Sequence, residues 1–157
     1  MYFFGLDFAF ANNGIVQLDE NSKIIEASVT KTNKKNSDEE RLIYLRETVR
    51  NRISKDDIVY LEGLSYSSQG QAKAQMGAVH YITRIFLFEN GIKYKIVTPS
   101  ELKKFITGKG QCKKDLILLN VFKKWGVEFD NSDLADAYGL ARMALEDHKK
   151  WNRITQY

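Results

Sequence analysis

The pattern of apolar and polar residues along the chain predicts five β-strands. Residues 2–8 are apolar and aromatic with almost no interruption, which is typical of a buried strand. Four shorter runs are bounded by turn-forming residues, and they cover residues 14–18, 24–30, 57–61 and 93–98. Turn chemistry at residues 19–22 indicates a hairpin, so the chain is expected to open with three antiparallel strands.

Apolar residues at helical spacing predict five helices. These cover residues 37–52, 71–89, 99–106, 112–125 and 132–147. Ser37 and Glu40 form a capping-box pattern at the start of the first. The helix 71–89 is apolar nearly all round its second half, which favours cover on two sides, one by the sheet and one by a second subunit. Residues 148–157 are polar and are expected to form a tail without a regular element.

The order of these elements predicts an α/β fold with a mixed five-stranded sheet flanked by helices. Three strands are followed by a helix, a strand, a helix, a strand and then helices alone. The chain of 157 residues is long enough to bury one core, and no linker, repeat or low-complexity segment divides it. We therefore expect a single domain.

Composition excludes several classes of protein. The single cysteine, Cys112, cannot form an internal disulfide, and two histidines are too few for a zinc site rich in cysteine and histidine. A reducing, cytoplasmic location is expected. No run of about 18 apolar residues indicates a membrane span, and no basic segment precedes the N-terminal apolar stretch, as a signal peptide requires. The net charge of +4 suits a polyanionic partner such as nucleic acid, although many basic proteins bind none.

Four carboxylates are candidates for a metal-dependent site. Asp7 lies in the most apolar strand, where a lone carboxylate is costly unless it is paired or holds a metal. Glu62 directly follows the strand 57–61, at the end where α/β folds place active sites. Asp133 and Asp136 share a helix face, although acids in a first turn also stabilise the helix and Asp133 could cap it. Together they could hold two Mg²⁺ or Mn²⁺ ions that activate water for phosphodiester hydrolysis.

The motifs around these residues resemble those of the RuvC family of Holliday-junction resolvases. Residues 4–7 (Phe-Gly-Leu-Asp) are similar to the family's first acidic motif, residues 59–62 (Val-Tyr-Leu-Glu) to its second, and residues 133–141 to its C-terminal Asp-x-x-Asp-Ala helix. The order of elements also matches, to about residue 147. The resemblance implies one ribonuclease H-like nuclease domain over residues 1–157, acting as a homodimer that makes paired nicks in branched DNA. It also implies an active site that binds two Mg²⁺ or Mn²⁺ ions. The catalytic and metal-binding residues of this site would be Asp7, Glu62, Asp133 and Asp136.

The same resemblance suggests residues that bind DNA. Lys114 matches the lysine that follows the family's glycine-containing loop, and Lys103 matches an earlier DNA-contacting lysine. Lys109 and Lys113 add positive charge to this loop, where cations can meet phosphates, although a solvated basic face is the alternative and is favoured for Lys109 taken singly. Tyr66 is the aromatic residue nearest to the family's junction wedge, displaced from it by about one position.

Other interpretations stay open. The first motif continues as Asp7-Phe8-Ala9 and lacks the Asp-Pro-Gly-like turn of the bacterial enzymes, which suits a divergent member, for example from a phage in its host's cytoplasm. A ribonuclease H-like nuclease acting on RNA:DNA hybrid or RNA is one alternative. A non-catalytic module that binds branched DNA is another. A nucleotide-binding fragment of the actin type would need a glycine-rich phosphate loop after the first strand, which the chain lacks.

Overall fold

The computed structural model describes residues 1–64 and 70–154, and only the backbone of residues 153 and 154. Its elements follow the predicted order: β1 (Phe3–Phe8), β2 (Asn12–Leu18), β3 (Ile24–Lys31), α1 (Asp38–Arg50), β4 (Ile58–Glu62), α2 (Gln71–Glu89), β5 (Lys93–Val97), α3 (Pro99–Thr107), α4 (Lys114–Trp125) and α5 (Ser132–Ile154). The strands form a mixed sheet in the order β3-β2-β1-β4-β5, with β4 and β5 parallel to β1 and the hairpin strands antiparallel. The predicted fold class is confirmed.

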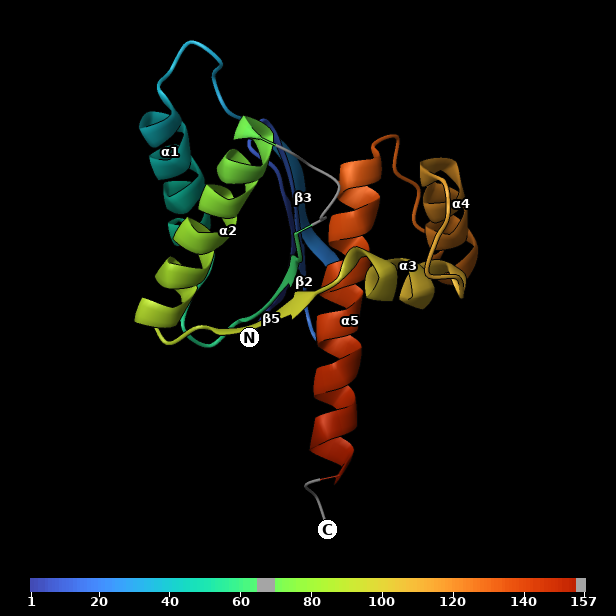
Figure 1. Cartoon of the computed structure of the whole chain (residues 1–157). Helices are drawn as coiled ribbons and strands as arrows, with labels where there is room; N and C mark the ends of the chain where they lie inside the picture. Colours follow the sequence, from blue (N-terminus) through green and yellow to red (C-terminus); the bar gives the residue numbers. More distant parts are fainter. Residues whose placement is uncertain (65–69, 155–157) are drawn as a thin grey trace.

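The sheet lies between two layers of helices (Figure 1). The helices α1 and α2 cover one face, and α5 covers the other with α3 and α4 packed beside it. Successive side chains of a strand point to opposite faces. Phe4 and Leu6 therefore join the core under α1 and α2, whereas Phe3 joins the core under α5. Asp7 follows the same alternation and faces α5.

Two glycines in the sheet allow α5 to lie directly on the strands. A side chain at Gly5 would meet the backbone of Ala137 and Ala141, and one at Gly14 would meet the backbone of Asp133. Because no side chain separates them, the helix backbone contacts the backbone of β1 and β2. This close approach fixes where the first turns of α5 lie relative to the end of β1.

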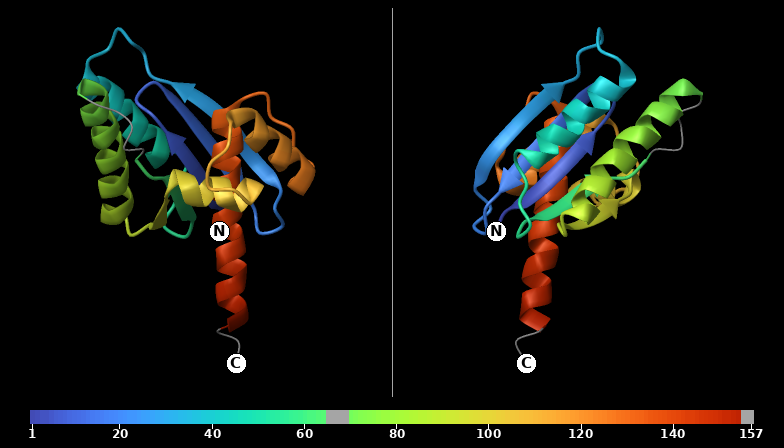
Figure 2. Two further views of the ribbon diagram at one scale, coloured as in Figure 1. Left: turned by 45° about the vertical axis from the view of Figure 1, so that its right-hand side comes forward. Right: turned by 90° about the vertical axis from the view of Figure 1, so that its left-hand side faces the viewer.

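The helix α5 is longer than predicted, and the expectation of a tail at residues 148–157 is wrong as far as residue 154. The helix extends beyond the lower end of the sheet (Figure 2). Asp147 accepts a hydrogen bond of 2.8 Å from the Tyr60 hydroxyl, and the His148 ring lies 5.3 Å from the ring of Phe3. These contacts hold the helix against the sheet past the point where its apolar pattern ends.

The remaining element boundaries differ from the predicted ones by no more than two residues. The capping box is present, since the Ser37 side chain accepts from the Glu40 backbone and Glu40 accepts from that of Ser37. Within residues 1–64 and 70–154, no helix has both the length and the apolar character needed to cross a bilayer.

Candidate active site

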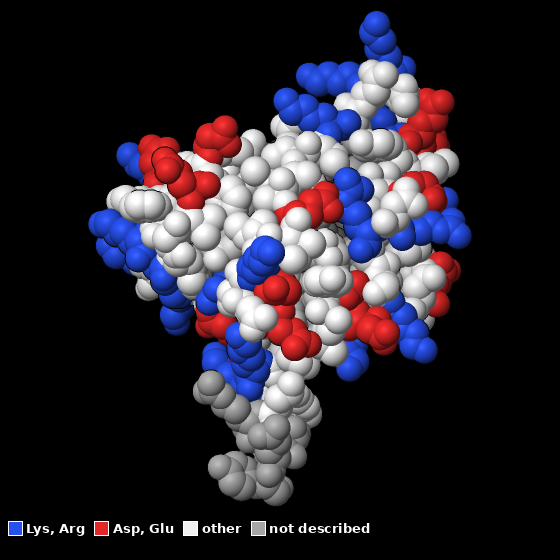
Figure 3. Space-filling model, turned by 180° about the vertical axis from the view of Figure 1, so that it is seen from behind, with Lys and Arg blue, Asp and Glu red and all other residues white. Residues whose placement is uncertain are grey.

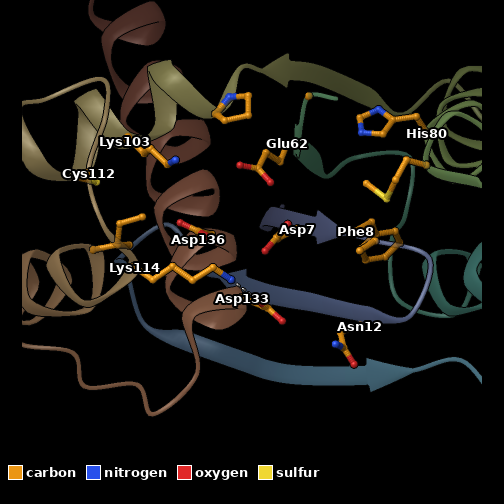
Figure 4. Close-up of a pocket in the computed structure, with 15 residues that line it drawn as sticks. Asp7, Phe8, Asn12, Glu62, His80, Lys103, Cys112, Lys114, Asp133 and Asp136 are labelled. Atoms are coloured by element: carbon orange, nitrogen blue, oxygen red, sulfur yellow. Dashed lines mark ion pairs between the residues drawn. The ribbon is translucent and has the colours of Figure 1, made fainter. Parts of the chain in front are cut away.

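The structure brings all four predicted carboxylates to one pocket. In the parallel pairing of β1 with β4, Leu6 lies opposite Leu61, so the next residue of each strand, Asp7 and Glu62, is a neighbour at the carboxyl end of the sheet. The first turns of α5 cross this edge and add Asp133 and Asp136. These side chains line a cavity of about 390 Å³ (Figure 4).

The start of α5 is capped by a residue that the sequence did not single out. The side-chain oxygen of Asn131 accepts hydrogen bonds from the backbone N–H groups of Asp133, at 2.7 Å, and Leu134, at 3.4 Å. An accepting side chain at this position satisfies the donors left open at a helix start. Asp133 is therefore not needed as the cap, and its carboxylate faces the pocket.

Burial and mutual repulsion perturb three of the carboxyl groups. Burial raises the pKa of Asp7 well above its usual range, and the negative charges of Glu62 and Asp133 raise it further. Burial also raises the pKa of Glu62, against the effect of a hydrogen bond from Asp7 that lowers it. The pKa of Asp136 rises to about 7, mainly through burial and then through the charge of Asp7. Such a cluster of perturbed acids in a cleft is typical of functional sites.

One oxygen of this carboxylate cluster has no hydrogen-bond donor among the described residues. The Oδ1 atom of Asp136 is buried and accepts no hydrogen bond in the described chain. A set of carboxylate oxygens with an unsatisfied acceptor suits a hard divalent cation. The four carboxylates line the pocket, but their side chains do not converge on one position. Among the described residues, no three Asp, Glu, His or Cys side chains are already arranged to hold an ion.

Two of the predicted lysines lie on the pocket wall. The Lys114 ammonium nitrogen is 3.8 Å from Oδ1 of Asp133 and 3.3 Å from the Ser132 hydroxyl. Lys103 comes from α3 on the same side of the cavity (Figure 4). The charges of both lysines lower the pKa values of Glu62 and Asp136, which partly offsets the effect of burial.

The other predicted DNA-binding residues do not line this pocket. Lys109 lies in the loop between α3 and α4, and Lys113 lines a separate hollow on the outside of α4. Tyr66 lies outside the described residues. The surface charges are mixed in sign on the side seen in Figure 3, where positive side chains gather most clearly on the projecting loop before α1.

The wall opposite the lysines contains residues that sequence reasoning missed. Phe8 and His80 stand there (Figure 4), and Met76 and Asn12 also line the pocket. Met76 and His80 are four residues apart in α2 and so share one helix face. That spacing was visible in the sequence, but nothing in it indicated that this face reaches the acidic pocket.

Comparison with known proteins agrees with the motifs and the fold. No family model matches the chain. It is 26% identical over 155 residues to the crossover junction endodeoxyribonuclease RuvC of Brachyspira hyodysenteriae, with 96% of this chain and 97% of that protein covered. The chain is a RuvC homologue. The resemblance inferred from the three acidic motifs is thus confirmed.

Solved RuvC structures share the fold of this RuvC homologue. Thermus thermophilus RuvC superposes with a TM-score of 0.74 at 22% identity, covering 98% of this chain and 96% of that one. The same protein in complex with a Holliday junction substrate superposes with a TM-score of 0.72 at 19% identity, covering 99% and 96%. The likeness extends over nearly the whole length of each chain, so the ribonuclease H-like architecture includes the strands and helix that carry the four carboxylates.

Proposed function

We propose that this RuvC homologue is an endodeoxyribonuclease that cuts branched DNA and resolves Holliday junctions by paired nicks. The observation that carries the proposal is the pocket where Asp7, Glu62 and Asp136 gather with raised carboxyl pKa values beside Lys103 and Lys114. The substrate is supported by the crossover-junction activity in the name of the B. hyodysenteriae protein and by the junction complex of T. thermophilus RuvC.

The donor set fits Mg²⁺ or Mn²⁺, with two ions in each site. Asp7, Glu62, Asp133 and Asp136 would hold them, and the unsatisfied Oδ1 of Asp136 is a ready ligand atom. When bound, such ions supply an activated water and stabilise the leaving oxygen of a phosphodiester. The carboxyl groups must give up their protons first, so binding is expected to strengthen as the pH rises through their raised pKa values.

The lysines would attract the phosphates of DNA, whereas the carboxylates would repel them. Four carboxylates face two lysines, so the pocket repels a phosphate unless cations neutralise it. Lys103 and Lys114 would attract the phosphate backbone and orient it along their wall. Replacing a carboxylate by its amide removes a ligand and a repulsive charge together, so cleavage should be lost while DNA binding is kept or strengthened.

A second copy of the chain would supply the second nick. In α2, Val79, Phe86 and Leu87 pack on the sheet, and the opposite side presents an exposed apolar face. Ile85 and Phe88 on that face are 52% and 76% exposed. We infer that this face pairs with the same face of a partner, as the two-sided apolar pattern of the helix predicts.

The remaining predicted contacts complete the DNA surface. Lys109 lies in the loop before α4 and Lys113 is the N-cap residue of that helix; both are outside the pocket and would contact a duplex arm. The role of Tyr66 as a wedge stays a prediction on the sequence resemblance. Together with Lys103 and Lys114 in the pocket, these contacts would place the junction across the carboxyl end of the sheet.

The proposal is tested by cleavage of a labelled four-way junction beside linear duplex, a fork and an RNA:DNA hybrid. Each is incubated with Mg²⁺, Mn²⁺ or EDTA and with wild type or Asp7→Asn. Metal-dependent paired nicks in the junction, absent in Asp7→Asn, are the expected result. Cutting of the hybrid alone would replace the proposal by a ribonuclease H-type activity, and tight junction binding without any cleavage would replace it by a binding module.

A further inference from the structure

The pocket has two walls of different chemical character. Lys103 and Lys114 stand on one side of the carboxylates, and Phe8 and His80 stand on the other (Figure 4). Met76 belongs to the second wall, one helical turn before His80. None of the three residues on that wall carries a fixed charge. A DNA strand whose phosphate lies among the lysines and carboxylates would therefore direct a different, uncharged part of the nucleotide toward α2.

His80 is a buried polar side chain that makes no side-chain hydrogen bond to another residue within 1–64 and 70–152. Only 3% of it is exposed, yet no hydrogen bond joins either ring nitrogen to another described residue. Its nearest charged neighbour along the helix is Arg84, one turn further on. Buried polar groups in proteins are nearly always hydrogen-bonded, so a ring on the pocket wall with no partner among the described residues is available to an atom of a ligand.

The ring is suited to a neutral ligand. Burial lowers the pKa of His80, and the positive charge of Arg84 lowers it further. A neutral imidazole has one donor and one acceptor, the pattern that matches the edge of a nucleobase. Met76 adds a polarisable, apolar surface of the kind that lies well against a flat ring. A phosphate would instead favour the lysine wall, where its charge is matched.

We propose that His80 and Met76 form a subsite for one nucleobase of the strand being cut, next to the scissile phosphate. His80 hydrogen-bonds the edge of the base, and Met76 packs against its face. This inference rests on the proposed function and deepens it, because it makes the site sensitive to nucleotide sequence at one position. The residue acts on substrate choice and positioning, and the chemistry stays with the carboxylates.

The test is the cleavage-site profile of junctions randomised around the exchange point. Wild type is compared with His80→Leu, His80→Gln and Met76→Ala, and with His148→Gln as the matched histidine control at the far end of α5. We expect wild type to prefer certain bases at one position beside the cut. His80→Leu should reduce that preference roughly 3- to 10-fold, the range expected for one hydrogen bond, and His80→Gln should change which base is preferred. The profile of His148→Gln should match that of wild type.

Thermal unfolding without DNA separates this role from a structural one. An imidazole that makes no hydrogen bond to the described residues contributes little to the fold, so His80→Leu should unfold at the same temperature as wild type or higher. A lower unfolding temperature for both His80 variants with an unchanged cleavage profile would overturn the proposal. So would an equal loss at all sequences with a flatter salt dependence, which would indicate a phosphate contact.

A binding measurement keeps the proposal independent of cleavage. In the Asp7→Asn background, 2-aminopurine at the position beside the cut reports on base unstacking by its fluorescence. A signal on binding that falls with the additional change His80→Leu supports the subsite. If the Asp7→Asn protein gives no fluorescence change on binding, the proposal is overturned, even if wild type resolves junctions. Failure of the proposed function is seen separately, as the absence of metal-dependent DNA cleavage by wild type.

Discussion

Adding one methyl group at Gly5 should displace α5, the helix that carries Asp133 and Asp136. A side-chain carbon at this position would lie 2.6 Å from the backbone nitrogen of Ala141, and closer still to the carbonyl oxygen of Ala137. Such atoms rest at about 3.5 Å, so relieving both contacts requires α5 to move away from β1 by at least ~1 Å. Both close contacts are backbone atoms, which cannot turn aside as a side chain can. The movement takes Asp136 away from Asp7 and Glu62.

The expected loss is larger in activity than in stability. A misplacement of about 1 Å in an active site can lower the rate on the order of 100-fold, which corresponds to ~2.7 kcal/mol of transition-state stabilisation. Overpacking of this kind typically costs ~1–3 kcal/mol of unfolding free energy. Single-turnover cleavage of a four-way junction by Gly5→Ala, at saturating protein, measures the first quantity, and urea unfolding measures the second.

The matched control is Gly77→Ala in α2. A side-chain carbon at Gly77 meets nothing within 4 Å, and a helical alanine in place of glycine should stabilise the protein by up to ~1 kcal/mol. Its cleavage rate should equal that of wild type. If Gly5→Ala folds and cleaves at the wild-type rate, the close approach of α5 to β1 does not position the carboxylates and the reasoning fails.

Three further results follow from the site and the α2 surface. The pKa of Asp136 rises from 3.8 to about 7 on folding, so ionisation of this carboxyl group opposes folding above about pH 4. The metal-free protein should therefore lose stability as the pH rises toward 7. Asp136→Asn should raise the melting temperature at pH 8 and leave it unchanged near pH 3. Lys114→Ala should lower the slope of log affinity against log salt by about one unit in DNA-binding titrations, whereas Lys123→Ala on the last turn of α4 should not. Phe88→Ser should shift the protein from dimer to monomer in sedimentation, and a wild type that sediments as a monomer would refute the pairing through α2.

Local patterns predicted most of the fold because the apolar periodicity and the capping residues of this chain agree with the elements that it forms. The strand 2–8 is apolar enough to be buried on both faces, and the Ser37–Glu40 capping box marks the start of α1 without reference to the rest of the chain. The end of α5 was different. Residues 148–154 form a helix because Asp147 and His148 contact β-strand residues far away in sequence, and no local pattern encodes those contacts.

The candidate site was predictable in its acids and its two lysines, and not in the wall that α2 contributes. Asp7 and Glu62 stand out because a carboxylate next to an apolar strand needs a reason, and the helix face shared by Asp133 and Asp136 follows from their spacing alone. His80 gave no such signal. A histidine on a helix is ordinary until the structure shows that its helix reaches the acidic edge of the sheet.

The glycines explain why the acidic motifs have the sequence they do. Gly5 precedes Asp7 by two positions, so both point to the α5 face of the same strand. Gly5 lets the backbone of α5 contact the strand, and Asp7 then lies close to the carboxylates on that helix. Gly14, paired with Asp7 across the hairpin, lets the backbone of Asp133 approach in the same way. The glycine and the acid of the first motif therefore act together. Gly5 sets a short distance between β1 and α5, and this distance brings Asp7 close to the carboxylates of α5.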